Sequence, residues 1–177
     1  MLRVTVAVSG RLRGEALRGY LLTWLARQYR DSDLRAFVRE HPQDWLVWEA
    51  GPWRPPSRRR ETLRTEEVRF AATAKEPIAI VLEPAADGAP LRVGRAAGND
   101  IVIDDPTLSR VHLELVRDGE ARWRVGDVGS SNGTRLAGVR IGREPVPLPV
   151  GVVLEAGAAR LSLYDAAALF LRLRGAA

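Results

Sequence analysis

Residues 94–112 read GRAAGNDIVIDDPTLSRVH, and residues 127–133 read DVGSSNG. In both stretches short polar segments stand beside runs rich in valine, isoleucine and leucine. This spacing predicts that the apolar runs are strands and that the polar segments are the loops between them. It indicates a set of loop tips that converge on a charged ligand.

The same pattern of short apolar runs and polar turns extends from Pro77 almost to the end of the chain. Short apolar or alternating runs such as IAIVLE, VHLELVRD and RLSLY are separated by turn sequences such as ADGAP, RDGE and SSNG. Many short strands at this spacing predict a β-sandwich or a β-barrel. Residues 165–175 fit a short helix with Asp165 as its N-cap and Gly175 as its C-cap, and a last strand is the alternative.

The polar residues of the two opening stretches have the chemistry that a phosphoryl group requires. A phosphoryl group carries almost two negative charges and three acceptor oxygens. Guanidinium groups and short hydroxyl donors bind it through charge-assisted hydrogen bonds, and Arg95, Ser109, Arg110 and Ser131 are of these types. Asn132 can both donate and accept, which suits a peptide main chain beside the phosphate.

The order Gly-Arg, Asn-Asp, Ser-x-x-His and Asp-x-x-Ser-x-Asn-Gly resembles the forkhead-associated (FHA) domain over about residues 77–165. The resemblance implies a mainly β fold, a sandwich of many short antiparallel strands that binds phosphothreonine. It implies that Arg95 and Ser109 bind the phosphate, with Arg110 beside them and Ser131 assisting. Asn132 would hold the main chain just after the phosphothreonine.

Other motif residues are expected to support the site. Gly94 and Gly133 allow tight turns or a positive φ, and the resemblance implies that His112 ties the binding loops together by hydrogen bonds. In one position the chain departs from the family: NGTRLAG has Ala137 where a second asparagine is common. That asparagine braces the loop, so its replacement bears on loop order and not on the phosphate ligands.

The first part of the chain has a different pattern. LRVTVAVS (2–9) predicts a strand, the apolar spacing of residues 15–29 predicts an amphipathic helix, and residues 31–42 predict a second one, capped by Ser32. A segment with Trp45, Trp48 and Trp53 follows; either it packs against the helices and the next domain, or it forms an aromatic, basic surface. We expect an N-terminal region at 1–55, a Pro/Arg-rich linker at 56–76 and the sandwich with its C-terminal helix or strand at 77–177.

The basic charge of the 177-residue chain lies in its first part. Residues 1–76 hold 15 Arg and Lys against 10 Asp and Glu, a net charge of +5, whereas residues 77–177 hold 12 of each. There is no cysteine, so neither disulfides nor thiolate chemistry are available. No apolar run has the roughly 18 residues of a membrane span, and we expect a cytoplasmic protein without membrane contact. The arginine bias is typical of a GC-rich, bacterial genome.

These observations favour a phosphothreonine-dependent adaptor in Ser/Thr-kinase signalling, which would bind a phosphorylated partner such as a kinase or its substrate. Two alternatives stay open: a phosphate-independent scaffold, and a DNA-binding regulator that uses the basic N-terminal region. We expect no enzymatic activity, because no phosphate loop with lysine and no convincing catalytic triad is present. Asp104 and Asp105 have no evident third ligand, so we expect neither a metal site nor a cofactor.

Overall fold

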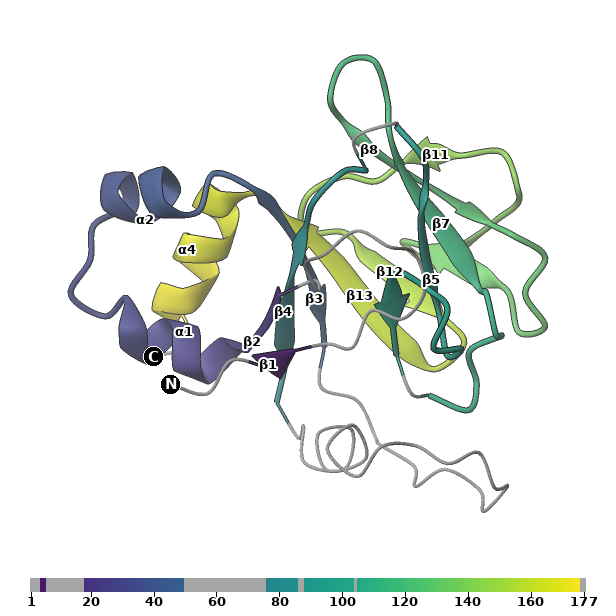
Figure 1. Cartoon of the computed structure of the whole chain (residues 1–177), viewed down its shortest axis with the longest axis horizontal. Coiled ribbons are helices and arrows are strands. Elements are labelled where there is room, and N and C mark those ends of the chain that lie inside the picture. The colour runs from purple at the N-terminus through teal and green to yellow at the C-terminus, as the bar shows by residue number, and fades with distance from the viewer. Residues whose placement is uncertain (1–3, 6–17, 50–75, 86–87, 104, 176–177) are drawn as a thin grey trace.

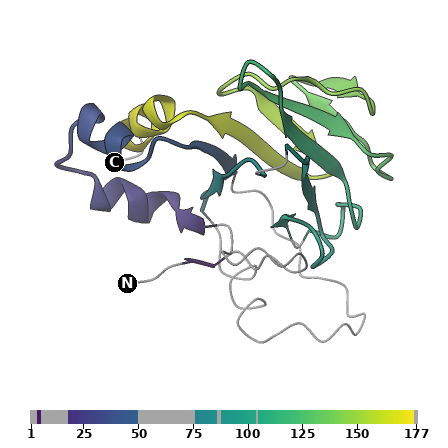
Figure 2. The ribbon, with the colours of Figure 1, turned by 45° about the horizontal axis from the view of Figure 1, so that its top comes forward.

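The computed structural model describes residues 4–5, 18–49, 76–85, 88–103 and 105–175. The strands of this part of the chain form two sheets, and its helices gather beside the larger sheet (Figure 1, Figure 2). The smaller sheet has the order β11-β8-β7-β5-β6. Its strands are β5 (Leu91–Gly94), β6 (Ile101–Val102), β7 (Leu113–Arg117), β8 (Trp123–Asp127) and β11 (Val146–Pro147).

The larger sheet has eight strands in the order β1-β2-β4-β3-β13-β12-β9-β10. They are β1 (Val4–Thr5), β2 (Arg18–Leu21), β3 (Asp44–Trp48), β4 (Ile78–Leu82), β9 (Thr134–Leu136), β10 (Val139–Ile141), β12 (Val153–Ala156) and β13 (Ala159–Tyr164). The helices are α1 (Leu22–Gln28), α2 (Leu34–Glu40) and α4 (Ala166–Gly175).

The larger sheet separates two apolar cores, and its strands show this in their side-chain alternation. On β3, Leu46 belongs to the core between the sheets, whereas Trp45 and Val47 belong to the core beneath the helices. All five residues of β4 are buried because both faces of this strand are covered. The expected β-sandwich is therefore confirmed, with a helical layer added on the outer face of its larger sheet.

The structure corrects the predicted helix at residues 15–29. Residues 18–21 are strand β2, which pairs with β4, and helix α1 begins only at Leu22. Pairing with β4 satisfies the backbone of this segment and overrides the helical spacing of its apolar residues. The second predicted helix forms as α2, but its cap is Asp33, whose side chain accepts a 2.7 Å hydrogen bond from the Ala36 N–H, and not Ser32. Of the predicted strand 2–9, only residues 4–5 are described.

Trp45 and Trp48 lie in β3, inside the sheet of the sandwich and between β4 and β13. Trp45 is completely buried and packs against His41 and Tyr20. Residues from the expected N-terminal region and from the expected sandwich thus share one sheet and one core. Trp53 and the expected linker at 56–76, except for its last residue, lie outside the described residues.

Polar contacts fasten the helical layer to the rest of the chain. Arg172 of α4 makes two 2.6 Å hydrogen bonds to the carboxylate of Glu49 and a third to the hydroxyl of Tyr164. Arg174 donates to the main-chain oxygens of Arg30 and Ser32, between α1 and α2. The C-terminal segment forms a helix, and the Asp165 side chain accepts from the Ala168 N–H at its start. Within the described residues, no helix has the length and apolar character needed to cross a membrane.

Candidate functional site

The predicted site residues lie on three loops that follow β5, β6 and β8. The first two of these loops are joined at Gly94. The Arg95 N–H donates to the Ser109 carbonyl and the Ala96 N–H to the Arg110 carbonyl, each over 3.1 Å. A Cβ on Gly94 would lie 2.4 Å from the Arg110 carbonyl oxygen, so a larger residue would push the two loops apart.

The side chain of Asn99 also joins the loops after β5 and β6. Its buried side-chain amide donates to the carbonyls of Ala96 and Arg110, at 2.8 and 2.6 Å. The neighbouring Asp100 accepts from the Arg92 N–H at 2.8 Å. Both residues therefore shape the backbone around Arg95, and the structure gives neither of them a place in the wall of the pocket described below.

His112 joins the loop before β7 to the loop after β8. Its side chain is completely buried. Nδ1 accepts from the Ser109 N–H at 3.0 Å, and Nε2 lies 3.2 Å from the Gly133 carbonyl oxygen. Because a carbonyl can only accept, this arrangement requires the neutral tautomer with its proton on Nε2. His112 is thus a structural bridge between Ser109 and Gly133.

Two further hydrogen bonds connect these loops closer to the surface. The Ser131 N–H donates to the Ser109 hydroxyl at 2.9 Å. The side-chain amide of Asn132 donates to the Thr107 carbonyl at 2.6 Å. Thr107 is itself fixed, because its hydroxyl donates to Asp105 and accepts from the Ala158 N–H. The hydroxyl and amide groups of the site therefore have defined positions before any ligand binds.

Asp127 organises the third loop from within. Its buried carboxylate accepts hydrogen bonds from the Gly129 and Ser130 N–H groups and from the hydroxyls of Ser130 and Thr134, at 2.6 to 2.8 Å. Burial alone would raise the pKa of Asp127, but these hydrogen bonds outweigh it and lower the pKa to about 2. Asp127 is therefore an ionised anchor for residues 128–134. Gly133 completes the turn with a φ of +75°.

The three loops enclose an open pocket of about 730 Å³. All five residues predicted to contact a ligand line it: Arg95, Ser109, Arg110, Ser131 and Asn132. Apolar side chains contribute as well, among them Leu108, Val111 and Val128. Arg95 and Arg110 are exposed, and no carboxylate of the described residues forms an ion pair with either of them. The pocket thus combines two unpaired guanidinium groups with hydroxyl and amide groups, an arrangement suited to a ligand with a compact double negative charge.

Some residues that hold the pocket together were given no role from the sequence. Thr107 and Ser130 each fix a loop, because the hydroxyl of each donates to a carboxylate, of Asp105 or Asp127, and accepts from a main-chain N–H. The sequence did contain a signal, since Asp-x-Thr (105–107) and Asp-x-x-Ser (127–130) are spacings at which a carboxylate caps nearby N–H groups. Asp105 serves in this way, as its Oδ1 accepts from both the N–H and the hydroxyl of Thr107.

The described residues contain no group of three or more His, Asp and Glu side chains placed to hold a metal ion. Asp104 lies outside them. Ala137, which stands where the family commonly has asparagine, adopts a positive φ of 50° in the turn between β9 and β10. Its N–H donates to the Val153 carbonyl at 3.0 Å, so the turn is held by main-chain contacts.

Comparison with known proteins finds similarity to FHA domains over part of the chain. Solved FHA domains resemble the chain, including one from an Arabidopsis thaliana protein (28% identity, 70% of this chain and 85% of that chain, TM-score 0.49) and one from Chlamydia trachomatis (20%, 69% and 97%, 0.48). A third comes from a study of phosphothreonine-dependent FHA domain interactions (19%, 68% and 94%, 0.46). No curated protein sequence matches the chain. The FHA domain family model matches residues 91–157, which run from the start of β5 to the turn after β12 and include all the loops of the site.

Proposed function

We propose that the chain binds phosphothreonine-containing segments of partner proteins in the pocket between the loops after β5, β6 and β8. The observation that carries this proposal is the placement of Arg95, Ser109, Arg110, Ser131 and Asn132 around one open pocket. A phosphoryl group near neutral pH has close to two negative charges and three acceptor oxygens. Two exposed guanidinium groups and two hydroxyls match that demand.

Each residue has a separate role in this proposal. Arg95 and Ser109 bind the phosphoryl oxygens, Arg110 adds charge at the rim, and Ser131 assists from the opposite loop. Asn132 uses its Oδ1 and its second N–H to bind the main chain of the peptide, since one N–H is engaged by Thr107. Apolar side chains at the pocket, such as Val111 and Val128, offer contact to the methyl group that distinguishes threonine from serine.

The biological role that follows is that of an adaptor that recruits a protein only after a Ser/Thr kinase has phosphorylated it. The partner is such a kinase or one of its substrates, and the reaction is binding without turnover. An FHA domain suits this role because its ligand groups are fixed by the hydrogen bonds of His112, Asp127 and Thr107, so little ordering is needed on binding.

Isothermal titration calorimetry with pairs of peptides, each phosphorylated or unphosphorylated on the same threonine, tests the proposal. We expect measurable heat only for the phosphorylated member of a pair that binds. Peptides with phosphoserine in place of phosphothreonine test the contribution of the methyl group. Equal affinity for both members of a pair would overturn the proposal in favour of a phosphate-independent scaffold. Binding to unrelated duplex DNA that weakens with salt would favour the regulator.

A further inference from the structure

A second, smaller pocket lies on the outer face of the five-stranded sheet. Its volume is about 290 Å³, and its lining includes Pro90 before β5, Val116 of β7, Gly126 of β8, Val128 after β8, and Arg143 and Pro145 before β11. Glu114 and Asp127 complete the lining, so four of its eight residues have apolar side chains and three are charged. The strands alternate at this point, so Leu113 and Leu115 of β7 face the core and Val116 faces outward into the pocket.

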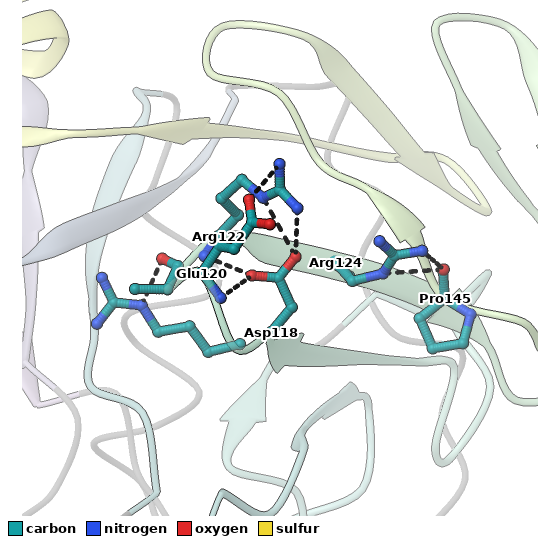
Figure 3. A network of polar contacts seen from close by, with 7 residues as sticks. Asp118, Glu120, Arg122, Arg124 and Pro145 are labelled. Atoms are coloured by element: carbon teal, nitrogen blue, oxygen red, sulfur yellow. Dashed lines mark hydrogen bonds and ion pairs between the residues drawn. The ribbon is translucent and has the colours of Figure 1, made fainter.

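The wall formed by residues 142–145 is held rigidly against β8. A Cβ on Gly126 would lie 2.7 Å from the Arg143 carbonyl oxygen, so only glycine permits this approach. The Asp127 N–H donates to the Gly142 carbonyl at 2.8 Å. Arg124 donates to the Pro145 carbonyl from Nε and Nη2, at 3.2 and 2.6 Å (Figure 3). The pocket is therefore built into the fold.

The hairpin between β7 and β8 is fixed in a similar way. Asp118 accepts from the N–H groups of Glu120 and Arg122 and from the Arg122 guanidinium (Figure 3). These contacts keep β7 and β8, which carry the floor of the pocket, in register. Both the floor and one wall thus exist without a ligand.

The small pocket borders the 730 Å³ pocket of Arg95, Ser109, Arg110, Ser131 and Asn132, called the phosphate pocket below after its proposed ligand. Val128 lines both of them. Gly129 lines the phosphate pocket, and the Arg143 guanidinium nitrogen Nη2 lies 3.1 Å from the place where a Cβ on Gly129 would stand. Arg143, which lines the small pocket, therefore lies at the junction of the two.

We propose that the bound phosphopeptide extends across Val128 and places an apolar side chain, from a residue that precedes the phosphothreonine, in the small pocket. This inference rests on the proposed function. The direction of the peptide follows from the loop after β8. Asn132, near one end of this loop, is assigned to the main chain after the phosphothreonine. Val128 lies at the other end, so the residues before the phosphothreonine should lie near Val128. An extended chain advances about 3.3 Å per residue, and the two pockets share a wall at Val128, so the selected side chain belongs to a residue near the phosphothreonine in sequence.

The surroundings of the pocket favour an apolar side chain over a charged one. Glu114, the acidic residue on its β7 side, already pairs with Arg92 at 3.3 Å. Arg143 would repel a basic side chain of the ligand, and Glu114 would repel an acidic one. A leucine, isoleucine or methionine side chain instead covers Val116, Pro145 and Pro90 and removes apolar surface from water.

The test uses the full chain and peptides with a fixed phosphothreonine and randomised flanking positions. We expect selection of leucine, isoleucine or methionine at one position within three residues before the phosphothreonine. A peptide with that residue should bind about tenfold more tightly than its serine counterpart, the lower end of the range for an apolar pocket, because this one is open to solvent.

Substitution of Val116 locates the selected side chain. Val116→Thr retains the size of the side chain, and Val116→Lys fills the pocket with a charge; both should abolish the preference and retain phosphate-dependent binding. Val150→Lys is the matched control, since Val150 is 44% exposed and lines neither pocket, and it should retain the preference.

Three outcomes would overturn the inference. Phosphate-dependent binding with no apolar preference before the phosphothreonine, or with a preference that both Val116 variants retain, refutes the small pocket and leaves the proposed function intact. Absence of any phosphate dependence refutes the proposed function and this inference with it.

Discussion

Asn132 donates a 2.6 Å hydrogen bond from its side-chain amide to the carbonyl oxygen of Thr107. This bond joins the loop after β8 to the loop before β7 at the rim of the phosphate pocket. It leaves one N–H and the Oδ1 of Asn132 for a ligand. The same side chain therefore serves both loop order and, in the proposed function, peptide binding.

Replacement of Asn132 by aspartate keeps the size of the side chain but removes its N–H donors, so it tests the hydrogen bonds of Asn132 alone. A carboxylate cannot donate to the Thr107 carbonyl, and it repels both that oxygen and a phosphoryl group. We expect at least a tenfold loss of phosphopeptide affinity, about 1.4 kcal/mol, together with a small decrease in melting temperature. Calorimetry and thermal unfolding measure the two effects. Unchanged affinity would exclude Asn132 from the binding surface.

Arg95→Ala should remove phosphopeptide binding without unfolding the protein. Arg95 is exposed, and in the proposed function it donates charge-assisted hydrogen bonds to the phosphate, at about 1.5–3 kcal/mol for each such bond. Titration calorimetry measures the affinity, and circular dichroism verifies the fold. Arg160→Ala, an exposed arginine of β13 outside the pocket, is the control and should bind like the unmodified chain. If Arg95→Ala binds normally, the phosphate does not occupy this pocket.

The lowered pKa of Asp127 predicts a specific loss of stability in acid. The carboxyl group has a pKa of about 2 in the folded protein and 3.8 as its ordinary value, so the unfolded state takes up its proton first. Its contribution of about 2 kcal/mol is complete above pH 4 and disappears as the pH falls toward 2. Urea unfolding at several pH values measures this.

Asp127→Asn provides the comparison for that measurement. The amide cannot take a proton in this range, so the stability difference between the two proteins should be largest at neutral pH and shrink below pH 4. A difference that stays constant from pH 7 to pH 3 would show that the carboxylate of Asp127 is not the origin of the acid sensitivity.

Ala137→Asn should stabilise the chain. Ala137 and Gly138 form the turn between β9 and β10 with φ values of +50° and +80°. Two-residue turns of this type favour Asn-Gly because asparagine tolerates the left-handed region better than alanine does. We expect a gain of about 0.5–1 kcal/mol in the free energy of unfolding. Ala137→Val, whose branched side chain is strained at positive φ, should have the opposite effect.

A chain that begins at residue 77 should not fold, although it contains every residue of the phosphate pocket. It lacks β3, which pairs with β4 on one side and with β13 on the other. It also lacks Trp45 and Phe37, which are completely buried under α4. Circular dichroism and gel filtration of residues 77–177 and of the full chain make the comparison. A folded, monomeric fragment would show that the N-terminal strands are dispensable.

The sequence predicted many short strands after residue 77 and five residues of the pocket wall, because both depend on local patterns. Polar motif residues such as Arg95 and Asn132 stand next to short apolar runs, and the turns between strands have their own residue signals. Contacts between distant segments could not be predicted in this way. The role of Thr107 depends on Ala158, 51 residues later, and the place of β2 depends on β4.

The composition change near residue 76 could not show where the folded unit begins. It marks the end of the basic part of the chain, and it suggested that the sandwich begins there. Trp45 and Val47 could belong to the core of a separate N-terminal domain or pack on the outer face of the sandwich. The pairing of β3 with β4 and β13 decides between these arrangements, and such pairing between distant segments is not visible in the local sequence. Pro42 and Gly51, which interrupt regular structure on either side of β3, are compatible with either arrangement.

The position of β3 also bears on how the protein is made. Trp48 pairs with Ile78 on one side and with Leu161 on the other, so β3 leaves the ribosome long before its second neighbour exists. Until β13 has been translated, β3 and β4 present a free strand edge that can associate with other chains. Closure of the sheet must therefore wait until β13 (residues 159–164) has been translated. Premature stop codons between residues 133 and 158 should yield products that aggregate or are degraded, even though the codons for the phosphate pocket have all been read.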